Sequence, residues 1–316
     1  MTRPLLRPLN PDALVLHRPT GTIRSPLRYP GGKRRLAPWV ADLLRALPFR
    51  VRTFAEPFAG GASVALQVMA EGLVDRLVLG ERDPLVAAFW ETAFTDTDWL
   101  VARVEAAPIT LDEWHRLRAA APRSRRERAW KALFLNRTSF SGILNGTAGP
   151  IGGQAQTSAY PIACRFPRLT LMRRLRSLAA YADRVTVVGN WQEALEAASG
   201  SEDFAYLDPP FFHKADRLYR YCFAQRDHAK LADALAAHPS TFLLSYDDAS
   251  EVEALYAARP NVHVHRVELL YSATERTRLV PKNELLITNR DALPDGRRLW
   301  RSGHEWRGAS SLGAET

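Results

Sequence analysis

Short apolar runs alternate with amphipathic stretches along most of this chain, and this alternation restricts its fold more than any other feature. Runs of Val, Leu, Ile and Phe bounded by turn residues are typical of buried strands. They predict strands at Val51–Ala55, Arg76–Leu79, Arg184–Val188, Phe204–Leu207, Thr241–Ser245, Val262–Leu270 and Glu284–Thr288. Helical periodicity follows several of these runs, at Ser63–Glu71, Gln192–Ala198, Arg226–Ala237 and Ser250–Ala258. The sequence therefore predicts an α/β fold, in which crossover helices connect the strands of a mostly parallel sheet.

The segment from residue 84 to residue 180 interrupts this alternation. It predicts helices at 85–94, 96–105, 111–120, 124–136 and 168–181, with a Gly/Ser/Thr-rich loop from Asn136 to Gly153. We therefore expect four regions: a loose N-terminal arm at 1–25, a catalytic domain at 26–83 and 181–292, an inserted helical domain at 84–180, and a C-terminal tail at 293–316. The insertion is basic between Arg123 and Lys131, which favours a role in substrate recognition. An ordinary helical subdomain with a solvated arginine-rich face has the same pattern.

Composition and charge narrow the choice of partners. The chain has 316 residues, of which 46% are hydrophobic, so it can bury a sizeable core. Its formal net charge of +9 indicates a polyanionic partner, with nucleic acid first and an acidic membrane surface second. No apolar run approaches the length of a membrane span, and Cys164 and Cys222 are expected to stay reduced. We therefore expect a soluble, cytoplasmic protein without a membrane partner.

A glycine turn lies between the first predicted strand and the first predicted helix, in the run Phe54-Ala55-Glu56-Pro57-Phe58-Ala59-Gly60-Gly61-Ala62-Ser63. Glycines allow the backbone to approach a ligand closely, and the helix that follows offers free N–H groups. The run matches neither Gly-x-Gly-x-x-Gly nor a Walker loop, which disfavours a dinucleotide or a nucleoside triphosphate. Glu81 follows the second strand, where an acidic residue often binds a ribose diol, so we expect a ligand that contains a nucleoside.

Further clusters are predicted to meet this turn at one edge of the sheet. Tyr29-Pro30-Gly31-Gly32-Lys33 is a second glycine turn, and Asn190-Trp191 offers an amide and a ring that can bracket an adenine. Asp208-Pro209-Pro210-Phe211 ends a predicted strand. Its carboxylate and carbonyl groups can accept the protons of an exocyclic amine, and its ring offers a stacking face. The cluster therefore suits methyl transfer to the amine of a planar base, although alone it can be only a strand that ends at a proline turn.

The order of these motifs resembles that of one family. Arg-Tyr-Pro-Gly-Gly-Lys comes first, followed by Glu-Pro-Phe-Ala-Gly-Gly-Ala-Ser. A helical insertion with Leu135-Asn136-Arg137-Thr138-Ser139-Phe140-Ser141-Gly142 precedes the Asp-Pro-Pro-Phe cluster, and Leu243–Asp248 and Lys282–Asn289 close the series. Over residues 26–290 the chain resembles the Dam-like (D12 class) adenine-specific DNA methyltransferases.

The resemblance implies a Rossmann-like methyltransferase sheet, S-adenosylmethionine as cofactor, and duplex DNA in which a flipped adenine is methylated at N6 by direct in-line displacement. It places against the cofactor Tyr29, Pro30, Lys33, Glu56, Phe58, Ala59, Gly60, Gly61, Ala62, Ser63, Glu81, Arg82, Asn190, Trp191 and Asp208. Asp208 would also bind the target amine, which Pro209 and Pro210 would orient while Phe211 stacks on the base. In the insertion it implies that Arg137 contacts a phosphate, that the loop enters the flipped-out site, and that DNA is contacted by Asn136, Arg137, Thr138, Ser139 and Asn145.

The sequence departs from the family pattern at several positions. Phe211 replaces the commoner tyrosine, and Glu81 and Asn190 each replace the usual aspartate. Ala62 replaces a glycine, which we expect to be tolerated if the backbone φ there is negative. The loop after Gly142 lacks the arginine-rich stretch of the Dam enzymes, so a GATC target is not expected.

Three alternatives stay open at this point: an N4-cytosine DNA methyltransferase, which more often carries Ser-Pro-Pro-Tyr, an RNA base-amine methyltransferase, and a catalytically inactive DNA-binding module. We expect a monomer or weak dimer, with a cognate restriction endonuclease encoded nearby as a candidate partner. No metal site is expected, because the pair His263 and His265 lacks a third ligand. Asp247-Asp248 is predicted to cap the helix that begins near Ser250.

Overall fold

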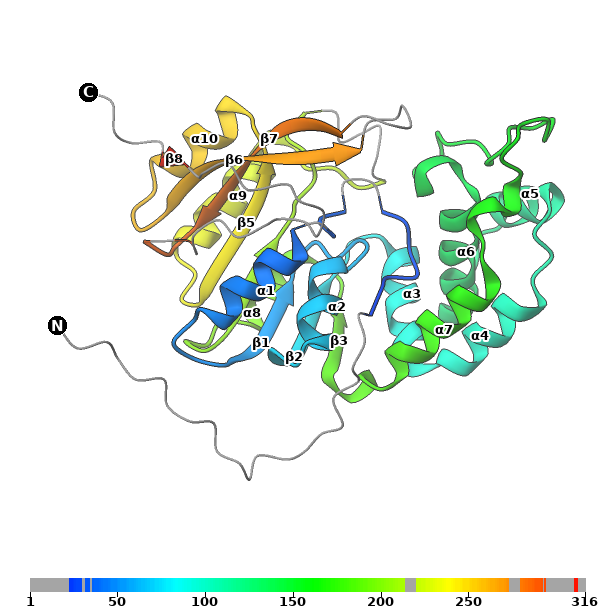
Figure 1. Ribbon diagram of the computed structural model, residues 1–316, viewed down its shortest axis with the longest axis horizontal. Coiled ribbons are helices and arrows are strands. Elements are labelled where there is room, and N and C mark those ends of the chain that lie inside the picture. Colours follow the sequence, from blue (N-terminus) through cyan, green and yellow to red (C-terminus); the bar gives the residue numbers. More distant parts are fainter. Residues whose placement is uncertain are drawn as a thin grey trace.

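The structure, a computed structural model, describes residues 23–29, 32–34, 36–213, 220–272, 279–291, 293 and 310–311. These residues form a mixed α/β fold in which a helical bundle lies beside one mostly parallel sheet (Figure 1). The predicted fold class is therefore confirmed.

The sheet has the strand order β3-β2-β1-β4-β5-β7-β6-β8. Its strands are β1 (Val51–Glu56), β2 (Val74–Gly80), β3 (Val185–Val188), β4 (Phe204–Leu207), β5 (Thr241–Asp247), β6 (His263–Ser272), β7 (Leu279–Thr288) and β8 (Ser310–Ser311). The strands from β3 to β5 are parallel, whereas β7 pairs antiparallel with β5 and β6. The two residues of β8 belong to the predicted C-terminal tail and pair with β6, so this part of the tail is anchored. The strand order reverses between β1 and β4, and ligands of open α/β sheets bind at the carboxyl edge beside such a reversal.

Both faces of the sheet are covered by helices because side chains along each strand point alternately to the two faces. Phe54 and Phe204 point to one face, where their rings stack with centroids 5.7 Å apart, and Ala55 and Ala205 point to the other. The core on the first face includes α1 (Ala37–Arg45) and α2 (Ser63–Ala70). The core on the second face includes α8 (Trp191–Glu196), α9 (Gln225–Ala236) and α10 (Ser250–Ala257). Of these helices, only α1 was not predicted.

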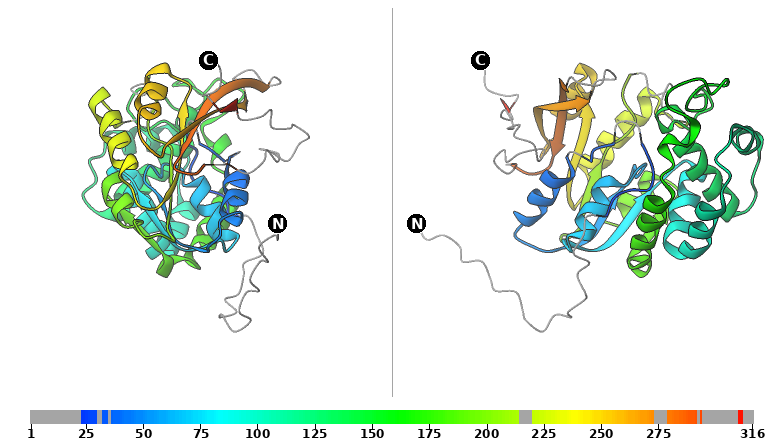
Figure 2. Two further views of the ribbon diagram at one scale, coloured as in Figure 1. Left: turned by 90° about the vertical axis from the view of Figure 1, so that its left-hand side faces the viewer. Right: turned by 45° about the vertical axis from the view of Figure 1, so that its right-hand side comes forward.

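The helical bundle lies to one side of the sheet and consists of the residues between β2 and β3 (Figure 2). Its elements are α3 (Pro84–Thr95), α4 (Thr97–Ala106), α5 (Leu111–Ala119), α6 (Arg125–Thr138) and α7 (Arg168–Ala179), with the 3-10 turns η1 (Phe140–Gly142), η2 (Ile162–Arg165) and η3 (Ala182–Arg184). A capping box starts α6, in which Ser124 and Glu127 each accept a hydrogen bond from the backbone N–H of the other. The predicted loop from Asn136 starts too early, since tight burial keeps the chain helical as far as Thr138.

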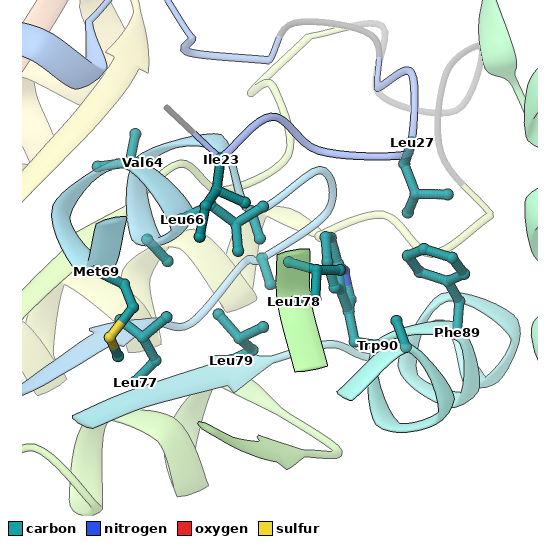
Figure 3. Packing of buried hydrophobic residues seen from close by; sticks show 14 of the residues in the cluster. Ile23, Leu27, Val64, Leu66, Met69, Leu77, Leu79, Phe89, Trp90 and Leu178 are labelled. Atoms are coloured by element: carbon teal, nitrogen blue, oxygen red, sulfur yellow. The ribbon is translucent and has the colours of Figure 1, made fainter. Parts of the chain in front are cut away.

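The N-terminal segment 23–29 runs between the sheet and the helical bundle (Figure 1). Its Ile23 and Leu27 are buried, and Figure 3 shows Ile23 over α2 and Leu27 over Phe89 of α3. Residues 23–25 of the predicted arm therefore pack against the protein, whereas residues 1–22 lie outside the described part of the chain. The segment fills the seam between the sheet and the bundle.

Gly80, at the end of β2, allows the backbone at Pro57 and the side chain of Ala194 in α8 to pack closely against this strand. A Cβ at Gly80 would lie 2.6 Å from the carbonyl oxygen of Pro57 and 3.0 Å from Cβ of Ala194. We expect Gly80→Ala to lower the free energy of unfolding by about 1–3 kcal/mol, because backbone must move to relieve the overlap. Chemical denaturation measures this change. The control is Gly189→Ala at the end of β3, where a Cβ would meet nothing within 4 Å and stability should hold within about 0.5 kcal/mol.

Candidate active site

A cavity of about 660 Å³ lies at the carboxyl edge of the sheet, beside the reversal in strand order. It is lined by the ends of β1, β2 and β4, the start of α8 and the segment that leads into α9. Every described residue for which a cofactor contact was predicted lines it: Tyr29, Lys33, Glu56, Phe58, Ala59, Gly60, Gly61, Ala62, Ser63, Glu81, Arg82, Asn190, Trp191 and Asp208. Pro30 is the remaining predicted contact and lies outside the described residues. The strand-end clusters thus meet at one site.

The glycine turn between β1 and α2 brings the backbone close to the cavity. Gly60 has a φ of 44°, and a Cβ there would lie 2.7 Å from the ring of Tyr29, so only glycine allows this approach. Ala62 has a φ of 48°, and the negative angle on which its tolerance was expected to depend is not found. This left-handed conformation costs an alanine about 1 kcal/mol. The first turn of α2, which begins at Ser63, holds the residue in place.

Glu81 ties the end of β2 to the glycine turn. Its carboxylate oxygens accept hydrogen bonds from the backbone N–H groups of Gly60 at 3.1 Å and Asp83 at 2.8 Å. Burial raises the pKa of Glu81 to about 7. Each carboxylate oxygen has a second lone pair, so Glu81 can hold the turn and still accept a hydrogen bond from a ligand hydroxyl in the cavity.

Asn190 and Trp191 lie at the start of α8, where both line the cavity. Asn190 is the N-cap: its side-chain oxygen accepts a hydrogen bond from the N–H of Glu193 at 2.9 Å, and its amide donates to the Glu193 carboxylate at 2.6 Å. The cap fixes the position of Trp191, whose half-buried ring packs against the second core. Both residues are therefore held in place before any ligand binds.

The carboxylate of Asp208 at the end of β4 is fixed through one of its oxygens. Oδ1 accepts hydrogen bonds from the ammonium of Lys33 at 2.8 Å and from the hydroxyl of Ser245 at 3.2 Å. The side chain of Lys33 is 4% exposed and that of Asp208 is 22% exposed, on the cavity side. Among the described residues no group donates to Oδ2, so this oxygen is available to a molecule in the cavity.

Glu284 on β7 is the second carboxylate beside Lys33, with its Oε1 3.7 Å from the ammonium nitrogen. Burial alone would lower the pKa of Lys33, but Asp208 and Glu284 raise it, so the ammonium stays charged. Burial raises the pKa of Asp208 against the opposing effect of Lys33, and it raises the pKa of Glu284 to about 7. The sequence analysis did not identify Glu284 as a site residue. The sequence signal that could have identified Glu284 is an acidic residue at the start of the apolar strand that ends at Thr288.

The remaining residues of the Asp-Pro-Pro-Phe cluster lie to either side of Asp208. Pro210 lines the cavity, whereas Pro209 is buried beneath it. Phe211 does not line the cavity, and its ring centroid lies 5.9 Å from the ammonium of Lys33. The ring thus lies next to Lys33 but outside the set of residues that line the cavity.

Contrary to the prediction, Asp247, the last residue of β5, and Asp248 do not cap α10. The N-cap is Ala249, and no side chain caps the helix. Asp247 instead accepts a hydrogen bond from the backbone N–H of Phe212 at 3.1 Å, and Asp248 pairs with Arg266 at 3.0 Å. The prediction was wrong because Asp247 lies next to the turn after β4, a contact between sequence-distant segments. Asp247 therefore holds the end of the turn that follows β4.

A wall of the cavity that the sequence did not predict comes from the segment before α9. Arg220, Tyr221, Phe223 and Asp227 line it. The guanidinium of Arg220 pairs with Asp83 at 2.9 Å, which joins this segment to the start of α3. The clustering of two aromatic residues shortly after Asp-Pro-Pro-Phe was the only signal in the sequence.

The insertion residues with predicted DNA contacts divide into two groups. Asn136, Thr138 and Ser139 are fully buried. The Asn136 amide donates to the carbonyl groups of Arg28 at 2.7 Å and Gly142 at 2.9 Å, and its oxygen accepts from the Arg28 N–H at 2.7 Å. The structure therefore places these three side chains as supports of the loop and not at a surface.

Arg137 and Asn145 have surroundings that differ from those of the buried group. Arg137 is 6% exposed and borders an opening near the N-terminal segment, and Asn145 is half-buried. Phe140, which the sequence analysis did not single out, is 64% exposed at the start of the loop. Phe140 is thus the large hydrophobic side chain that this loop exposes, next in the chain to the buried polar residues Thr138 and Ser139.

Two further tests concern metals and membranes. Within the described residues, no group of three histidine, cysteine, aspartate or glutamate side chains is arranged to hold a metal ion. In the same part of the chain, every helix is too short or too polar to cross a bilayer.

A mostly parallel sheet with a cavity at its carboxyl edge, beside the reversal in strand order, is the architecture of a Rossmann-like methyltransferase. A model of the D12 class N6 adenine-specific DNA methyltransferase family matches residues 29–273, and the chain belongs to this family. No curated protein matches the chain. Its activity is methylation of adenine N6 in DNA, and its family uses S-adenosylmethionine. No finding favours the cytosine, RNA or inactive-module alternatives.

The raised pKa of Glu284 predicts a pH-dependent stability. Between pH values equal to the ordinary pKa of 4.5 and the folded pKa of about 7, the Glu284 carboxyl binds its proton more tightly in the folded state than in the unfolded state. The free energy of unfolding therefore falls as the pH rises through this window, a loss that Glu284→Gln should not show. We expect the stability of the variant relative to wild type to rise by about 3 kcal/mol between about pH 4.5 and about pH 8.

Urea denaturation of both proteins across this range measures the difference. Glu105→Gln, which removes an exposed carboxylate of α4, is the control. A stability difference for Glu284→Gln that stays constant with pH would contradict the assignment.

Proposed function

We propose that this chain methylates N6 of a flipped adenine at specific sites in duplex DNA by direct in-line displacement, with Asp208 as the residue that binds the amine. The observation that carries the proposal is the state of the Asp208 carboxylate. Lys33 and Ser245 fix it through Oδ1, while Oδ2 remains available toward the cavity. A carboxylate held in this way needs no reorganisation when a base amine arrives.

The cavity fits an adenosyl group with an amino-acid tail. Gly60 leaves room beside Tyr29 that a Cβ would fill, and the first turn of α2 borders the same space at Ser63, with its Ala65 N–H donated to Glu56. We assign the amino-acid portion to the turn from Phe58 to Ser63, together with Tyr29, Lys33 and Glu56. Glu81 and Arg82 would hold the ribose, and Asn190 and Trp191 the adenine ring. Pro30 stays a prediction.

The chemistry then needs little from the protein beyond position and charge. The bound cofactor supplies a methyl group on a sulfonium, whose C–S bond breaks with its electron pair left on sulfur as the N6 lone pair forms the new C–N bond. Oδ2 of Asp208 and the backbone carbonyl of Pro209 accept hydrogen bonds from the amine and stabilise its developing positive charge. Asp208 receives the proton that N6 loses.

A base within a duplex cannot reach this cavity, so the adenine must leave the stack. Phe211 lies beside Lys33 and outside the cavity lining, and we assign its ring to stack on the flipped base while Pro210 orients the amine. The exposed ring of Phe140 supports insertion of the loop at the vacated position. Arg137 and Asn145 would contact the DNA, and Asn136, Thr138 and Ser139 would support that surface from below.

The wider setting follows from the same proposal. The net charge of +9 favours duplex DNA as the partner, and the insertion would read the target sequence. We propose that the chain acts in the cytoplasm as a monomer or weak dimer, with a restriction endonuclease encoded nearby. Digestion of host DNA by the product of a neighbouring gene, blocked by prior methylation, would test that pairing.

Nucleoside mass spectrometry tests the activity and the role of Asp208 together. We expect the purified protein and S-adenosylmethionine to form N6-methyladenine in methylation-free DNA and none in RNA. Asp208→Ala should lower the rate by about 100-fold or more, because the acceptor for the amine is lost. Lys33 keeps Glu284 as a charged partner in this variant, so the fold and DNA binding should persist. Near-normal turnover by Asp208→Ala would reject the assigned role.

The stacking role of Phe211 predicts a smaller effect. Phe211→Ala should remove about 1–3 kcal/mol of base stacking, which lowers kcat/KM for DNA while the melting temperature and cofactor binding stay unchanged. Phe211→Tyr, which keeps the ring, is the control and should retain the wild-type value. If Phe211→Ala is as active as Phe211→Tyr, the flipped base stacks elsewhere.

A further inference from the structure

Arginine side chains line a recess of about 320 Å³ at the seam between the sheet and the helical bundle. We name it the arginine recess, and its cations are Arg24, Arg28, Arg34, Arg137, Arg165 and Arg174. No carboxylate lines it, and none of the ion pairs among the described residues includes any of the six. A bound anion would stabilise these arginines, because six cations that have no carboxylate partner in the described part of the chain surround one small recess.

The cations come from segments that are distant in the sequence. Arg24 and Arg28 lie on the segment that fills the seam in Figure 1, Arg137 is near the end of α6, and Arg165 and Arg174 belong to η2 and α7. The segment is held in place on several sides, since Ile23 and Leu27 are buried in the core and its backbone is bound to the bundle. The recess is thus a formed feature of the fold.

Arg137 is the arginine of the recess that most needs a bound anion. It is 6% exposed, and its Nε is buried without a hydrogen-bond partner among the described residues. Burial, together with repulsion from Arg28, Arg174 and Arg165, lowers the pKa of Arg137 to about 10. A buried charge without a counter-charge costs several kcal/mol, and a bound anion would remove most of that cost.

We propose that the arginine recess binds a backbone phosphate of the DNA substrate, next to the target nucleotide. Guanidinium groups form paired hydrogen bonds with phosphate oxygens, and several around one recess exceed what a single carboxylate would need. The position follows from shared walls, because Tyr29, Gly32, Gly61 and Ser63 line both the recess and the cofactor cavity. The proposal rests on the DNA methyltransferase function and adds a phosphate site whose cations come mainly from outside the predicted DNA-contacting loop.

Two variants of the recess and one control variant outside it test this proposal. Arg165 is exposed, so Arg165→Gln removes a cation of the recess without endangering the fold. Arg76→Gln removes the same charge from an exposed position near the start of β2, at the opposite edge of the sheet from the cavity. Arg137→Met keeps an apolar chain of similar length in the buried position but removes the charge.

Fluorescence anisotropy with a short labelled duplex, measured at several salt concentrations, gives the first readout. We expect Arg137→Met to weaken DNA binding by about 10-fold or more, and Arg165→Gln by less. In both variants the slope of log K against log salt should become shallower by up to about one, as expected when a phosphate contact is lost. Arg76→Gln should match the wild type.

Thermal unfolding and calorimetry without DNA give the second readout. Arg137→Met should melt no lower than the wild type, because it removes a repelled buried charge, and should bind S-adenosylmethionine with unchanged affinity. A purely structural Arg137 predicts the reverse, a lower melting temperature with unchanged DNA affinity, and that result would overturn the proposal. Inorganic phosphate is the remaining probe. If it stabilises the wild type but not Arg137→Met while DNA affinity is unchanged in the variant, the recess serves a free anion and the proposal fails.

These outcomes are separate from the test of the proposed function. Wild-type protein that forms N6-methyladenine while the recess variants bind DNA normally would reject the phosphate site alone. Wild-type protein that binds DNA through the recess but forms no N6-methyladenine would reject the methyltransferase assignment alone.

Discussion

The ion pair between Lys33 and Asp208 is the contact on which the rest of the site depends. It joins residues 175 positions apart, at a nitrogen–oxygen distance of 2.8 Å, in a place where the lysine is almost completely buried. Two charges removed from water are stable together only if their geometry is kept, because either one alone would carry a large desolvation cost. The N-terminal turn, β4 and, through Glu284, β7 are therefore held to one arrangement. That arrangement aims Asp208 into the cavity.

The segment from Ile23 to Tyr29 connects this site to the helical bundle. Its buried side chains pack on both α2 and α3, and its backbone hydrogen bonds with Asn136 of α6. Tyr29, at its end, packs against the glycine turn of the cofactor cavity. A displacement of the bundle must therefore shift either this segment or the turn beneath it. The insertion and the cofactor cavity are mechanically linked through a stretch of seven residues.

The sequence predicted most of the sheet, because buried strands and amphipathic helices leave periodic patterns that depend on local chain geometry. It also predicted that the strand-end clusters meet at one edge of the sheet, since carboxyl ends of parallel strands must meet, and their described residues line one cavity. It could not show contacts between distant segments. Asn136 reads as a polar loop residue but is a buried crosslink to Arg28, and Asp247 reads as a helix cap but holds the turn after β4. The positive φ of Ala62 was equally hidden, since alanine rarely adopts it.

Opposite charges are collected on the two sides of the turn that carries Tyr29. Carboxylates, among them the buried Glu56 and Glu81 and the partly exposed Asp208, outnumber the cations Lys33, Arg82 and Arg220 around the cavity, whereas the charged residues that line the arginine recess behind the same turn are all cations. Under the proposed function, this excess of carboxylates would favour the positively charged sulfonium of the cofactor over the neutral thioether that remains after methyl transfer. It would thus favour cofactor binding before the reaction and product release afterwards. The segment between the two charge clusters keeps the arginines from pairing with the carboxylates, and the two proposals, a cofactor on one side and a phosphate on the other, both depend on this separation.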